Sequence, residues 1–175
     1  MPAAGYKLLN NSIAFFTLNH IIFIRMEENN ASQLPRYRAP EAKVLVIDDM
    51  PTNIRLIKEL LAPCEVKLYI ALSGAKAIAM VEKEYYDLIF MDHMMPEMDG
   101  LETSSRIRAL KSENSDLSRY YRTVPIILLT ANLEPGTDES LSQYGINGCI
   151  TKPIDLEKLY GTIERMLPPD KIIPC

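Results

Sequence analysis

The feature of this sequence that most constrains its fold is a set of short apolar runs separated by longer amphipathic stretches. The runs cover residues 44–47, 88–91, 126–129 and 149–151, and they consist mainly of apolar, β-prone residues. Strands that are apolar along their whole length are typical of a parallel sheet covered by helices on both faces. The alternation of such runs with helical periodicity therefore predicts an α/β fold.

From residue 43 onward, a strand and a helix alternate five times. We expect strands over 43–48, 66–71, 87–91, 125–129 and 147–151, and helices over 52–61, 75–84, 101–110, 134–144 and 156–167. Thr52 can cap the first helix and Asp155 the last, while Gly145 marks the end of the fourth. The long polar connection over 111–123 reads as a solvated extension of the third helix and its loop rather than as a partner surface. Right-handed crossovers then predict a (βα)5 doubly wound parallel sheet with the flavodoxin-like strand order 2-1-3-4-5.

Composition narrows the class of protein. The chain has 175 residues, of which 47% are hydrophobic and 24% charged, as expected for one soluble domain with extra length. A net charge of -4 and the lack of a basic run argue against a nucleic-acid binder. The three cysteines have neither the spacing of a disulfide scaffold nor that of a zinc site, which favours the reducing cytoplasm.

The beginning of the chain differs from the rest. The mostly apolar segment 13–24 is shorter than the roughly 20 residues that a membrane helix needs. It follows Lys7 as a signal-peptide core would, but no cleavage pattern is clear, so we expect a cytoplasmic protein. We divide the chain into an extension and linker over 1–41, poorly ordered or the remnant of an upstream domain, a folded domain over 42–168, and a tail over 169–175.

Polar side chains follow the predicted strands at one edge of the sheet. Asp48 and Asp49 close the first strand and Asp92 closes the third. Thr130 closes the fourth strand and Lys152 the fifth. Singly, each of these residues is an ordinary turn or capping residue. Together they suit the binding of a divalent cation and a phosphoryl group beside a nucleophilic carboxylate.

Four segments around these residues resemble the receiver domain of two-component signalling, the phosphoacceptor module of response regulators and hybrid histidine kinases. They are Val-Ile-Asp-Asp at 46–49, Met-Asp-His-Met-Met-Pro-Glu-Met-Asp-Gly at 91–100, Leu-Thr-Ala-Asn at 129–132 and Thr-Lys-Pro-Ile-Asp at 151–155. The resemblance covers about residues 42 to 168, and receivers of hybrid kinases are the most similar group.

The resemblance implies a role in a phosphorelay. Asp92 would accept a phosphoryl group from the phosphohistidine of a histidine kinase or a histidine phosphotransfer domain. Mg²⁺ would be bound directly by Asp49, Asp92 and the backbone carbonyl of Met94, with Asp48 acting mainly through water. Such a domain is a phosphoprotein and no enzyme in the usual sense, beyond Mg²⁺-dependent self-phosphorylation and autodephosphorylation.

The resemblance also implies roles on the output side. Thr130 would bond the phosphoryl group and move on activation, and Lys152 would pair with Asp92 or its phosphate and precede a cis bond to Pro153. One position departs from the family, because Cys149 stands where Tyr or Phe is usual. A thiol cannot sweep the volume of a ring, and we interpret Cys149 as a buried structural cysteine rather than a redox sensor.

Two alternatives to a phosphoacceptor stay open. The chain could be a receiver-like interaction module that works without phosphorylation. A Mg²⁺-dependent phosphohydrolase would need a second acid two residues after the nucleophile, where this chain has Met94. The resemblance also allows a homodimer through the face of the helix over 134–144, the strand over 147–151 and the last helix. It implies no contact of this domain with nucleic acid or membrane.

Overall fold

The computed structural model describes residues 34–131 and 137–175 of the chain. The apolar segment 13–24, Asn132 of the fourth-strand motif and the first residues of the helix expected over 134–144 therefore lie outside the described residues. No helix among those described combines the length and the apolar character that crossing a membrane requires.

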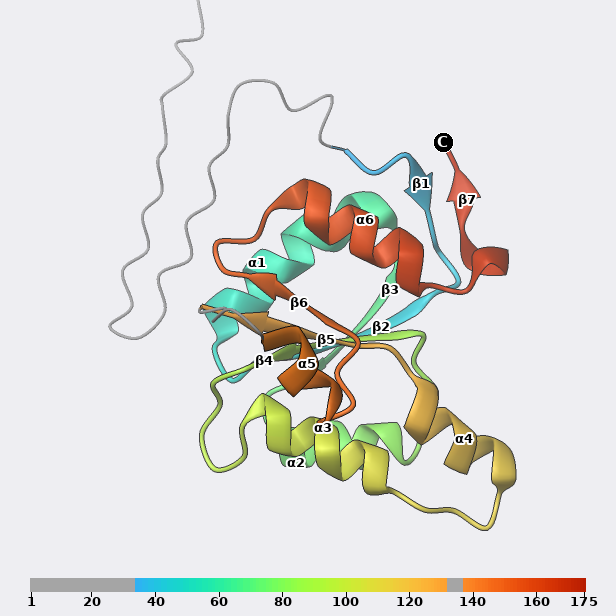
Figure 1. Ribbon diagram of the computed structural model, residues 1–175. Helices are drawn as coiled ribbons and strands as arrows, with labels where there is room; N and C mark the ends of the chain where they lie inside the picture. The colour runs from blue at the N-terminus through green and yellow to red at the C-terminus, as the bar shows by residue number, and fades with distance from the viewer. Residues whose placement is uncertain (1–33, 132–136) are drawn as a thin grey trace, which may run out of the picture.

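Five parallel strands form the central sheet in the order β3-β2-β4-β5-β6 (Figure 1). They are β2 (Lys43–Ile47), β3 (Lys67–Ala71), β4 (Leu88–Asp92), β5 (Ile126–Thr130) and β6 (Gly148–Thr151). Numbered within this sheet alone, the order is 2-1-3-4-5, so the predicted topology is confirmed. In β4 and β5 every residue is buried, as expected for central strands with helices on both faces.

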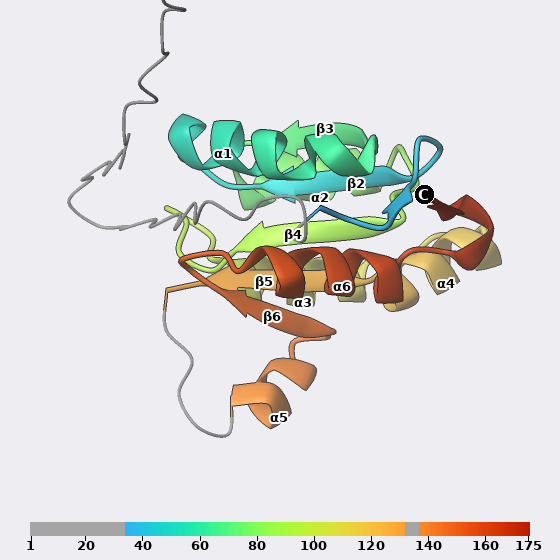
Figure 2. The same ribbon diagram turned by 90° about the horizontal axis from the view of Figure 1, so that it is seen from above.

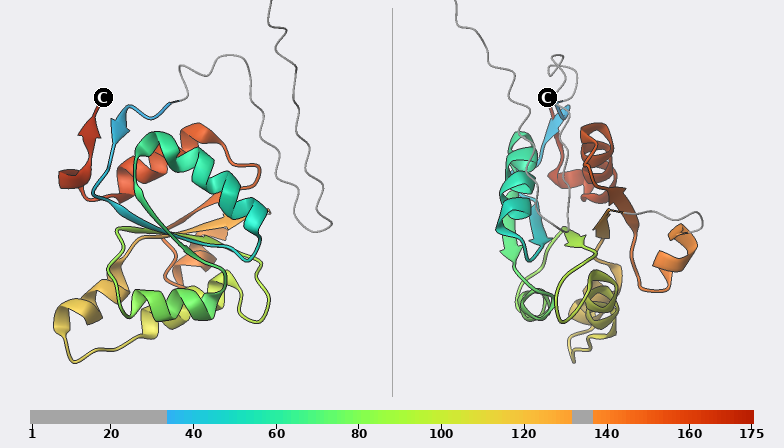
Figure 3. Two further views of the ribbon diagram at one scale, coloured as in Figure 1. Left: turned by 180° about the vertical axis from the view of Figure 1, so that it is seen from behind. Right: turned by 90° about the vertical axis from the view of Figure 1, so that its left-hand side faces the viewer.

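Helices cover the sheet on both sides (Figures 1 and 3). The helices are α1 (Pro51–Leu61), α2 (Gly74–Val81), α3 (Gly100–Ala109), α4 (Ser115–Thr123), α5 (Thr137–Ser142) and α6 (Leu156–Met166). Residues of α1 and α6 pack against one face, and residues of α2, α3, α4 and α5 belong to the cluster on the other. The expected alternation of strands and helices is therefore present, with one additional helix, α4.

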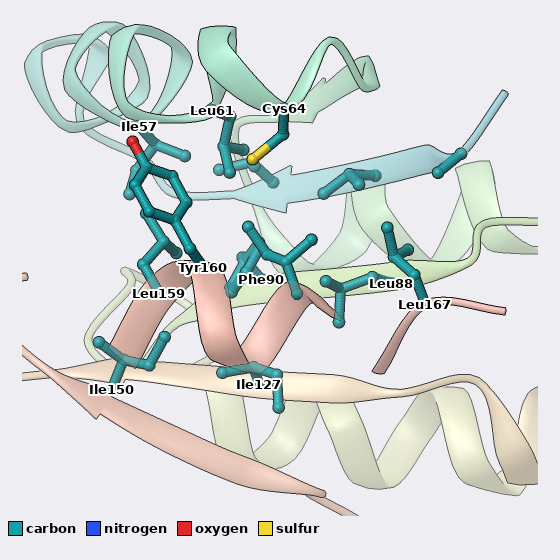
Figure 4. Packing of buried hydrophobic residues seen from close by; sticks show 14 of the residues in the cluster. Ile57, Leu61, Cys64, Leu88, Phe90, Ile127, Ile150, Leu159, Tyr160 and Leu167 are labelled. Atoms are coloured by element: carbon teal, nitrogen blue, oxygen red, sulfur yellow. The ribbon is translucent and has the colours of Figure 1, made fainter. Parts of the chain in front are cut away.

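The packing under α1 and α6 is centred on Phe90, which is fully buried (Figure 4). Around it lie side chains from three strands and from both helices, among them Ile57, Leu61, Leu88, Ile127, Ile150, Leu159 and Leu167. Burial of one such side chain contributes about 1.5–3 kcal/mol to stability. This face of the sheet is thus a continuous apolar layer that fixes where the strand ends lie.

Helix ends follow the expected chemistry in two of three cases. Asp155 accepts a hydrogen bond from the Lys158 amide at the start of α6, and Gly145 after α5 has a φ of 71°, in the left-handed region that favours glycine. The prediction that Thr52 caps α1 is wrong. The helix begins at Pro51, which has no backbone N–H to satisfy, and its N-cap Met50 makes no side-chain hydrogen bond.

The connection over 111–123 is mostly exposed, as expected, but it is not an extension of the third helix and its loop. Asn114 caps α4 by accepting hydrogen bonds from the Asp116 and Leu117 amides, so residues 115–123 form a helix of their own. Tyr121 is buried and Tyr120 is half-buried. The spacing of 117, 120 and 121 is the i, i+3, i+4 pattern of a helix with one apolar face, and it is the signal that the sequence analysis passed over.

Arg108 of α3 fastens this region together. Its guanidinium donates to the carbonyl oxygens of Tyr121 (2.9 Å), Val124 (2.8 Å) and Gly145 (2.6 and 2.9 Å), and to Asn147 Oδ1 (3.0 Å). Burial lowers the pKa of Arg108 to about 10. The residue thereby joins α3, the end of α4 and the connection between α5 and β6.

The two ends of the described structure pair with each other. The short strand β1 (Tyr37–Arg38) runs antiparallel to β7 (Ile173–Pro174), which follows a turn of 3-10 helix, η3 (Pro169–Lys171). The ordered structure thus includes residues expected in the extension and the tail. Figure 2 shows this ribbon beyond the amino ends of the central strands, away from their arrowheads.

Tyr37 of β1 is part of the core. Its ring is 2% exposed, and its hydroxyl donates to the carbonyl oxygen of Tyr160 in α6 at 2.8 Å. The same hydroxyl lies 3.9 Å from the thiol of Cys64, whose carbonyl accepts from the Ala39 amide. Cys64 belongs to a second turn of 3-10 helix, η2 (Ala62–Cys64), at the end of α1. The lead-in segment therefore closes the apolar layer between α1 and α6.

Candidate functional site

The structure brings together the strand-end residues that the sequence analysis singled out. Asp92 is the last residue of β4 and Thr130 the last of β5, while Asp48 and Lys152 directly follow β2 and β6. Backbone hydrogen bonds continue the ladder beyond the strands, from the Asp48 amide to Ala71 and from the Lys152 amide to Thr130. These residues are therefore held at one edge of the sheet by the strands themselves and not by flexible loops.

Side chains at this edge divide between the two faces of the sheet, because successive residues of a strand point to opposite sides. Asp48, Asp92 and Lys152 therefore point to the same face as the residues two positions before them, which lie in the layer under α1 and α6. Those preceding residues are Val46, Phe90 and Ile150. We call the four residues Asp48, Asp49, Asp92 and Lys152 the acidic pocket. Thr130, His93 and Cys149 alternate with them and lie toward the face covered by α2 and α3; we call these three residues the opposite group.

A lysine and two carboxylates form the buried part of the acidic pocket. Lys152 Nζ donates to Asp92 Oδ1 at 2.7 Å and lies 3.6 Å from Asp48 Oδ2. All three side chains are at most 2% exposed. A buried charge is tolerated only when it is paired or bonded, and one ammonium here faces two carboxylates. The pocket therefore has an excess of negative charge that a cation would balance.

Asp92 is bonded at only one of its oxygens. Oδ1 accepts from Lys152, while Oδ2 is the buried side-chain atom that has no hydrogen-bond partner among the described residues. Buried polar atoms are nearly always satisfied, so an exception calls for a functional reason. The bonds already made fix the carboxylate and leave Oδ2 for a bond to a cation or to phosphorus.

Two groups donate hydrogen bonds to the Asp48 carboxylate. The Met50 amide donates to its Oδ1 at 2.8 Å, and Asn53 Nδ2 lies 3.1 and 3.0 Å from its two oxygens. Burial, and after it the charge of Asp92, raises the pKa of Asp48, whereas Lys152 and these hydrogen bonds act in the opposite direction. The sequence motifs predicted no role for Asn53 in the site. Its position in the first turn of α1 is the only signal that could have placed it there.

The carboxylates fit a hard divalent cation. One oxygen each of Asp48, Asp49 and Asp92 lies within 4.8 Å of the others, and Asp49 is only half-buried. Oxygen ligands are those that Mg²⁺ prefers, and partial exposure leaves room for the waters that this ion retains. Together with the unbonded Oδ2 of Asp92, this donor set agrees with the expected Mg²⁺ site.

The connection after Asp92 is folded back on the strand end. The Gly100 amide donates to the His93 carbonyl at 2.9 Å, and Asp99 caps α3 through the Glu102 amide. A Cβ at Gly100 would lie 2.3 Å from the Asp92 carbonyl oxygen, which explains glycine at this position. Met94 lies in this connection with its side chain 58% exposed. The Asp-Gly turn thus determines the path of the segment that carries Met94.

A hydrogen bond joins two members of the opposite group. His93 Nδ1 and Thr130 Oγ1 are 3.1 Å apart. Cys149 packs against the cluster under α2 and α3 but is half-buried, so the prediction of a buried cysteine is wrong. The cis bond between Lys152 and Pro153 that the resemblance implied is present. The sequence analysis assigned no role to His93.

Comparison with known proteins identifies relatives of the domain. The sequence pattern of the response regulator receiver domain matches residues 44–164. Histidine kinase 3 of Arabidopsis thaliana is 30% identical over 189 residues, which covers 94% of this chain and 18% of the kinase. The hybrid signal transduction histidine kinase K of Dictyostelium discoideum is 33% identical over 136 residues, covering 78% of this chain and 11% of that protein. The chain thus spans less than a fifth of these relatives.

A solved structure of a receiver domain is also similar to this chain. The receiver domain of the sensor histidine kinase PA1611 of Pseudomonas aeruginosa PAO1 is 30% identical and superposes with a TM-score of 0.61. The match covers 71% of this chain and 96% of that domain. The PA1611 domain holds a magnesium ion in its active site cleft.

Proposed function

This chain belongs to the response regulator receiver domains of two-component signalling, and we propose that Asp92 is the residue that accepts the phosphoryl group. The observation that carries the proposal is the asymmetry of Asp92. Lys152 holds one of its oxygens at 2.7 Å, while the other is buried and has no partner among the described residues. A carboxylate so fixed is oriented for attack on phosphorus with little further ordering.

The transfer exchanges one bond for another. The phosphorus–nitrogen bond of a phosphohistidine breaks as an oxygen of Asp92 bonds to phosphorus, which gives an acyl phosphate. Phosphoryl transfer depends mainly on positioning and on compensation of charge. Lys152 supplies a positive charge to the phosphoryl oxygens, and the Thr130 hydroxyl supplies a hydrogen-bond donor. Both residues lie at ends of neighbouring strands and need no large rearrangement of the fold.

We also propose Mg²⁺ as the cofactor. Asp49, Asp92 and the backbone carbonyl of Met94 would hold it, and Asp48, fixed by Asn53, would act through water. Mg²⁺ supplies positive charge beside the carboxylate and the phosphoryl oxygens when it is bound. The all-oxygen set of carboxylates within 4.8 Å supports this choice, and PA1611, a relative with 30% identity, holds magnesium in the corresponding domain.

The proposed donor is a histidine kinase or a histidine phosphotransfer domain, because the curated relatives are hybrid and other histidine kinases. A homodimer through the face of α5, β6 and α6 stays a prediction. The domain is proposed to act as a phosphoacceptor whose surface changes on phosphorylation, with turnover limited to its own phosphoryl group.

The direct test is phosphorylation by a small donor. The full chain is incubated with acetyl phosphate and Mg²⁺, and the addition of one phosphoryl group is followed by intact mass and Phos-tag electrophoresis. We expect labelling of the wild type, none after Asp92→Asn, and wild-type labelling after Asp116→Asn, which changes an exposed aspartate of α4. Removal of Mg²⁺ with EDTA should abolish labelling in all of them.

Two results would refute the proposal: no labelling of the wild type with donor and Mg²⁺ present, or equal labelling after Asp92→Asn. Either would leave the alternative of an interaction module that works without phosphorylation. That module would bind its partner equally with and without beryllofluoride, a mimic of the phosphoryl group.

A further inference from the structure

The imidazole of His93 lies against the hydroxyl that is proposed to meet the phosphoryl group. His93 Nδ1 and Thr130 Oγ1 are 3.1 Å apart. The arrangement is built by the sheet, because the His93 amide donates to the Leu129 carbonyl at 2.9 Å and so extends the pairing of β4 with β5 by one residue. His93 is thereby kept directly beside Thr130.

The bond to His93 engages Thr130 on the side of the sheet away from the acidic pocket. His93 and Thr130 follow Met91 and Leu128, two residues of the cluster under α2 and α3. Asp92 and Lys152 extend toward the other face and bond to each other there. A Thr130 hydroxyl that is bonded to the imidazole therefore has to change its orientation before it can donate to a phosphoryl group on Asp92.

When Thr130 is the donor to His93, its bonds to the imidazole and to a phosphoryl group are mutually exclusive. A hydroxyl has one hydrogen to donate. In the neutral imidazole tautomer with its hydrogen on Nε2, Nδ1 is an acceptor and takes the hydrogen of Thr130. A phosphoryl oxygen is also an acceptor, so the same hydrogen cannot serve both groups.

We propose that His93 is a positioning residue that holds Thr130 in the resting state, and that Thr130 exchanges this bond for one to the phosphoryl group. The inference rests on the proposed phosphoacceptor function and deepens it, since it names the resting partner of the switching threonine. The exchange is noncovalent: the Oγ1 hydrogen leaves imidazole Nδ1 and points to a phosphoryl oxygen. His93 thereby disfavours the phosphorylated state, because its bond to Thr130 competes with the bond from Thr130 to the phosphoryl group.

A competing bond between His93 and Thr130 lowers the affinity of the domain for a mimic of the phosphoryl group. One net hydrogen bond between neutral groups corresponds to roughly a 2- to 10-fold change in an equilibrium constant. His93→Ala should therefore bind beryllofluoride, with Mg²⁺ present, roughly 2- to 10-fold more tightly than the wild type. His93→Asn retains an amide oxygen that can accept from Thr130 and should bind close to the wild-type value.

The experiment measures beryllofluoride affinity of the full chain by ¹⁹F NMR or calorimetry. The variants are wild type, His93→Ala, His93→Asn, Thr130→Ala and the double variant His93→Ala with Thr130→Ala. The matched control is Leu72→Ala, which removes an exposed side chain from another connection at the same sheet edge and should leave the affinity unchanged. The tightening should vanish in the Thr130→Ala background, because the competing bond is already absent there.

A second measurement keeps the inference testable if a variant fails to fold. In the wild type, the ¹⁵N shifts of the His93 ring should indicate a hydrogen on Nε2, and the Nδ1 shift should change when beryllofluoride and Mg²⁺ are added. An unchanged Nδ1 shift, equal or weaker binding by His93→Ala, or tightening that persists without Thr130 would each overturn the role of His93. Failure of the wild type to bind beryllofluoride would instead overturn the phosphoacceptor function.

Discussion

The acidic pocket and the opposite group share one edge of the sheet but are built in different ways. In the acidic pocket, Lys152 and its two carboxylate partners are charged and at most 2% exposed. In the opposite group, the bond between His93 and Thr130 joins an imidazole and an uncharged hydroxyl, and Cys149 is half-buried. Charged hydrogen bonds are about twice as strong as neutral ones. One region is thus made to stay in place, while the other can exchange its bonds at small cost.

Under the proposed function, this difference separates the acceptance of a phosphoryl group from the response to it. A preorganised pocket compensates charge without rearranging during the reaction. A response needs two states that differ by only a few kcal/mol, so that a ligand can shift their populations. The β strands supply both, because alternate residues of one strand end reach opposite faces of the sheet. Four substitutions test this division, and they follow from the largest expected effect to the smallest.

The first concerns Arg108, which joins α3, α4 and the connection before β6 on the face of the sheet toward which the opposite group lies. Arg108→Met should lower the free energy of unfolding by about 3 kcal/mol, since three partly buried carbonyl groups and Asn147 lose their donor. Urea denaturation measures the change. Arg106→Met is the control, because Arg106 makes an exposed ion pair with Glu102 that should contribute less than about 0.5 kcal/mol. Equal costs for the two variants would show that Arg108 does not fasten α4 to the domain.

The second concerns the acidic pocket. Lys152→Met should slow labelling by acetyl phosphate about 100-fold, the usual cost of removing one group that stabilises charge in a transition state. The initial rate of phosphoryl incorporation measures it. Lys158→Met, at an exposed position in the first turn of α6, should label at the wild-type rate. A Lys152→Met variant that labels normally would mean that the buried ammonium serves stability alone.

The third uses the raised pKa of Asp48. A carboxyl whose pKa is higher in the folded state favours folding when protonated, and this contribution is lost as the pH rises through the folded pKa. At neutral pH and without cation, ionised Asp48 therefore reduces stability, and Asp48→Asn should raise the free energy of unfolding. The gain should shrink as the pH falls toward the unfolded pKa, about 4.

The same substitution should weaken Mg²⁺ binding roughly 10-fold, as expected for a residue that acts through water. Urea denaturation at several pH values, with and without Mg²⁺, tests both effects. A loss of stability at neutral pH after Asp48→Asn would contradict the sign. It would mean that the bonds from Met50 and Asn53 outweigh the burial of the charge.

The fourth prediction has the smallest expected effect. Cys149→Ala should lower the free energy of unfolding by less than about 1 kcal/mol, because the residue is only partly buried. It should change the labelling rate less than about 2-fold, within the effect of one weak contact. The comparison variant is Cys64→Ala, at a buried thiol whose pKa burial raises to about 11. A large change in labelling after Cys149→Ala would show that the opposite group takes part in phosphoryl acceptance.

The sequence was sufficient for the sheet and for the carboxyl edge. Apolar runs identify buried parallel strands, and the carboxyl ends of parallel strands meet at one edge, so Asp48, Asp92 and Lys152 had to lie near each other. The expected order of the strands and the cis bond before Pro153 are both present. The strand order depends on local pattern and topology, which a sequence carries directly, whereas the cis bond was implied by the family resemblance.

Other features depend on side-chain direction or on distant partners. The contact of His93 with Thr130 follows from the register of β4 against β5, and the bonds of Asn53 to Asp48 follow from the entry angle of α1. The helix α4 is short, so its pattern was read as loop. The two-residue strands β1 and β7 are shorter than any periodicity can reveal, and their pairing joins residues 37 and 174.

That pairing has a mechanical consequence. The Cys175 amide donates to the Arg36 carbonyl at 2.8 Å, so the polypeptide leaves the domain beside the point where it enters. Paired strands are about 5 Å apart, so the entering and leaving segments lie close together. A five-residue strand is about 16 Å long, which separates these segments from the carboxyl edge of the sheet. A longer protein could therefore carry this unit as an insertion without separating the parts on either side. Those parts would join it at the end remote from Asp92, which under the proposed function leaves the Asp92 edge open to a phosphoryl donor.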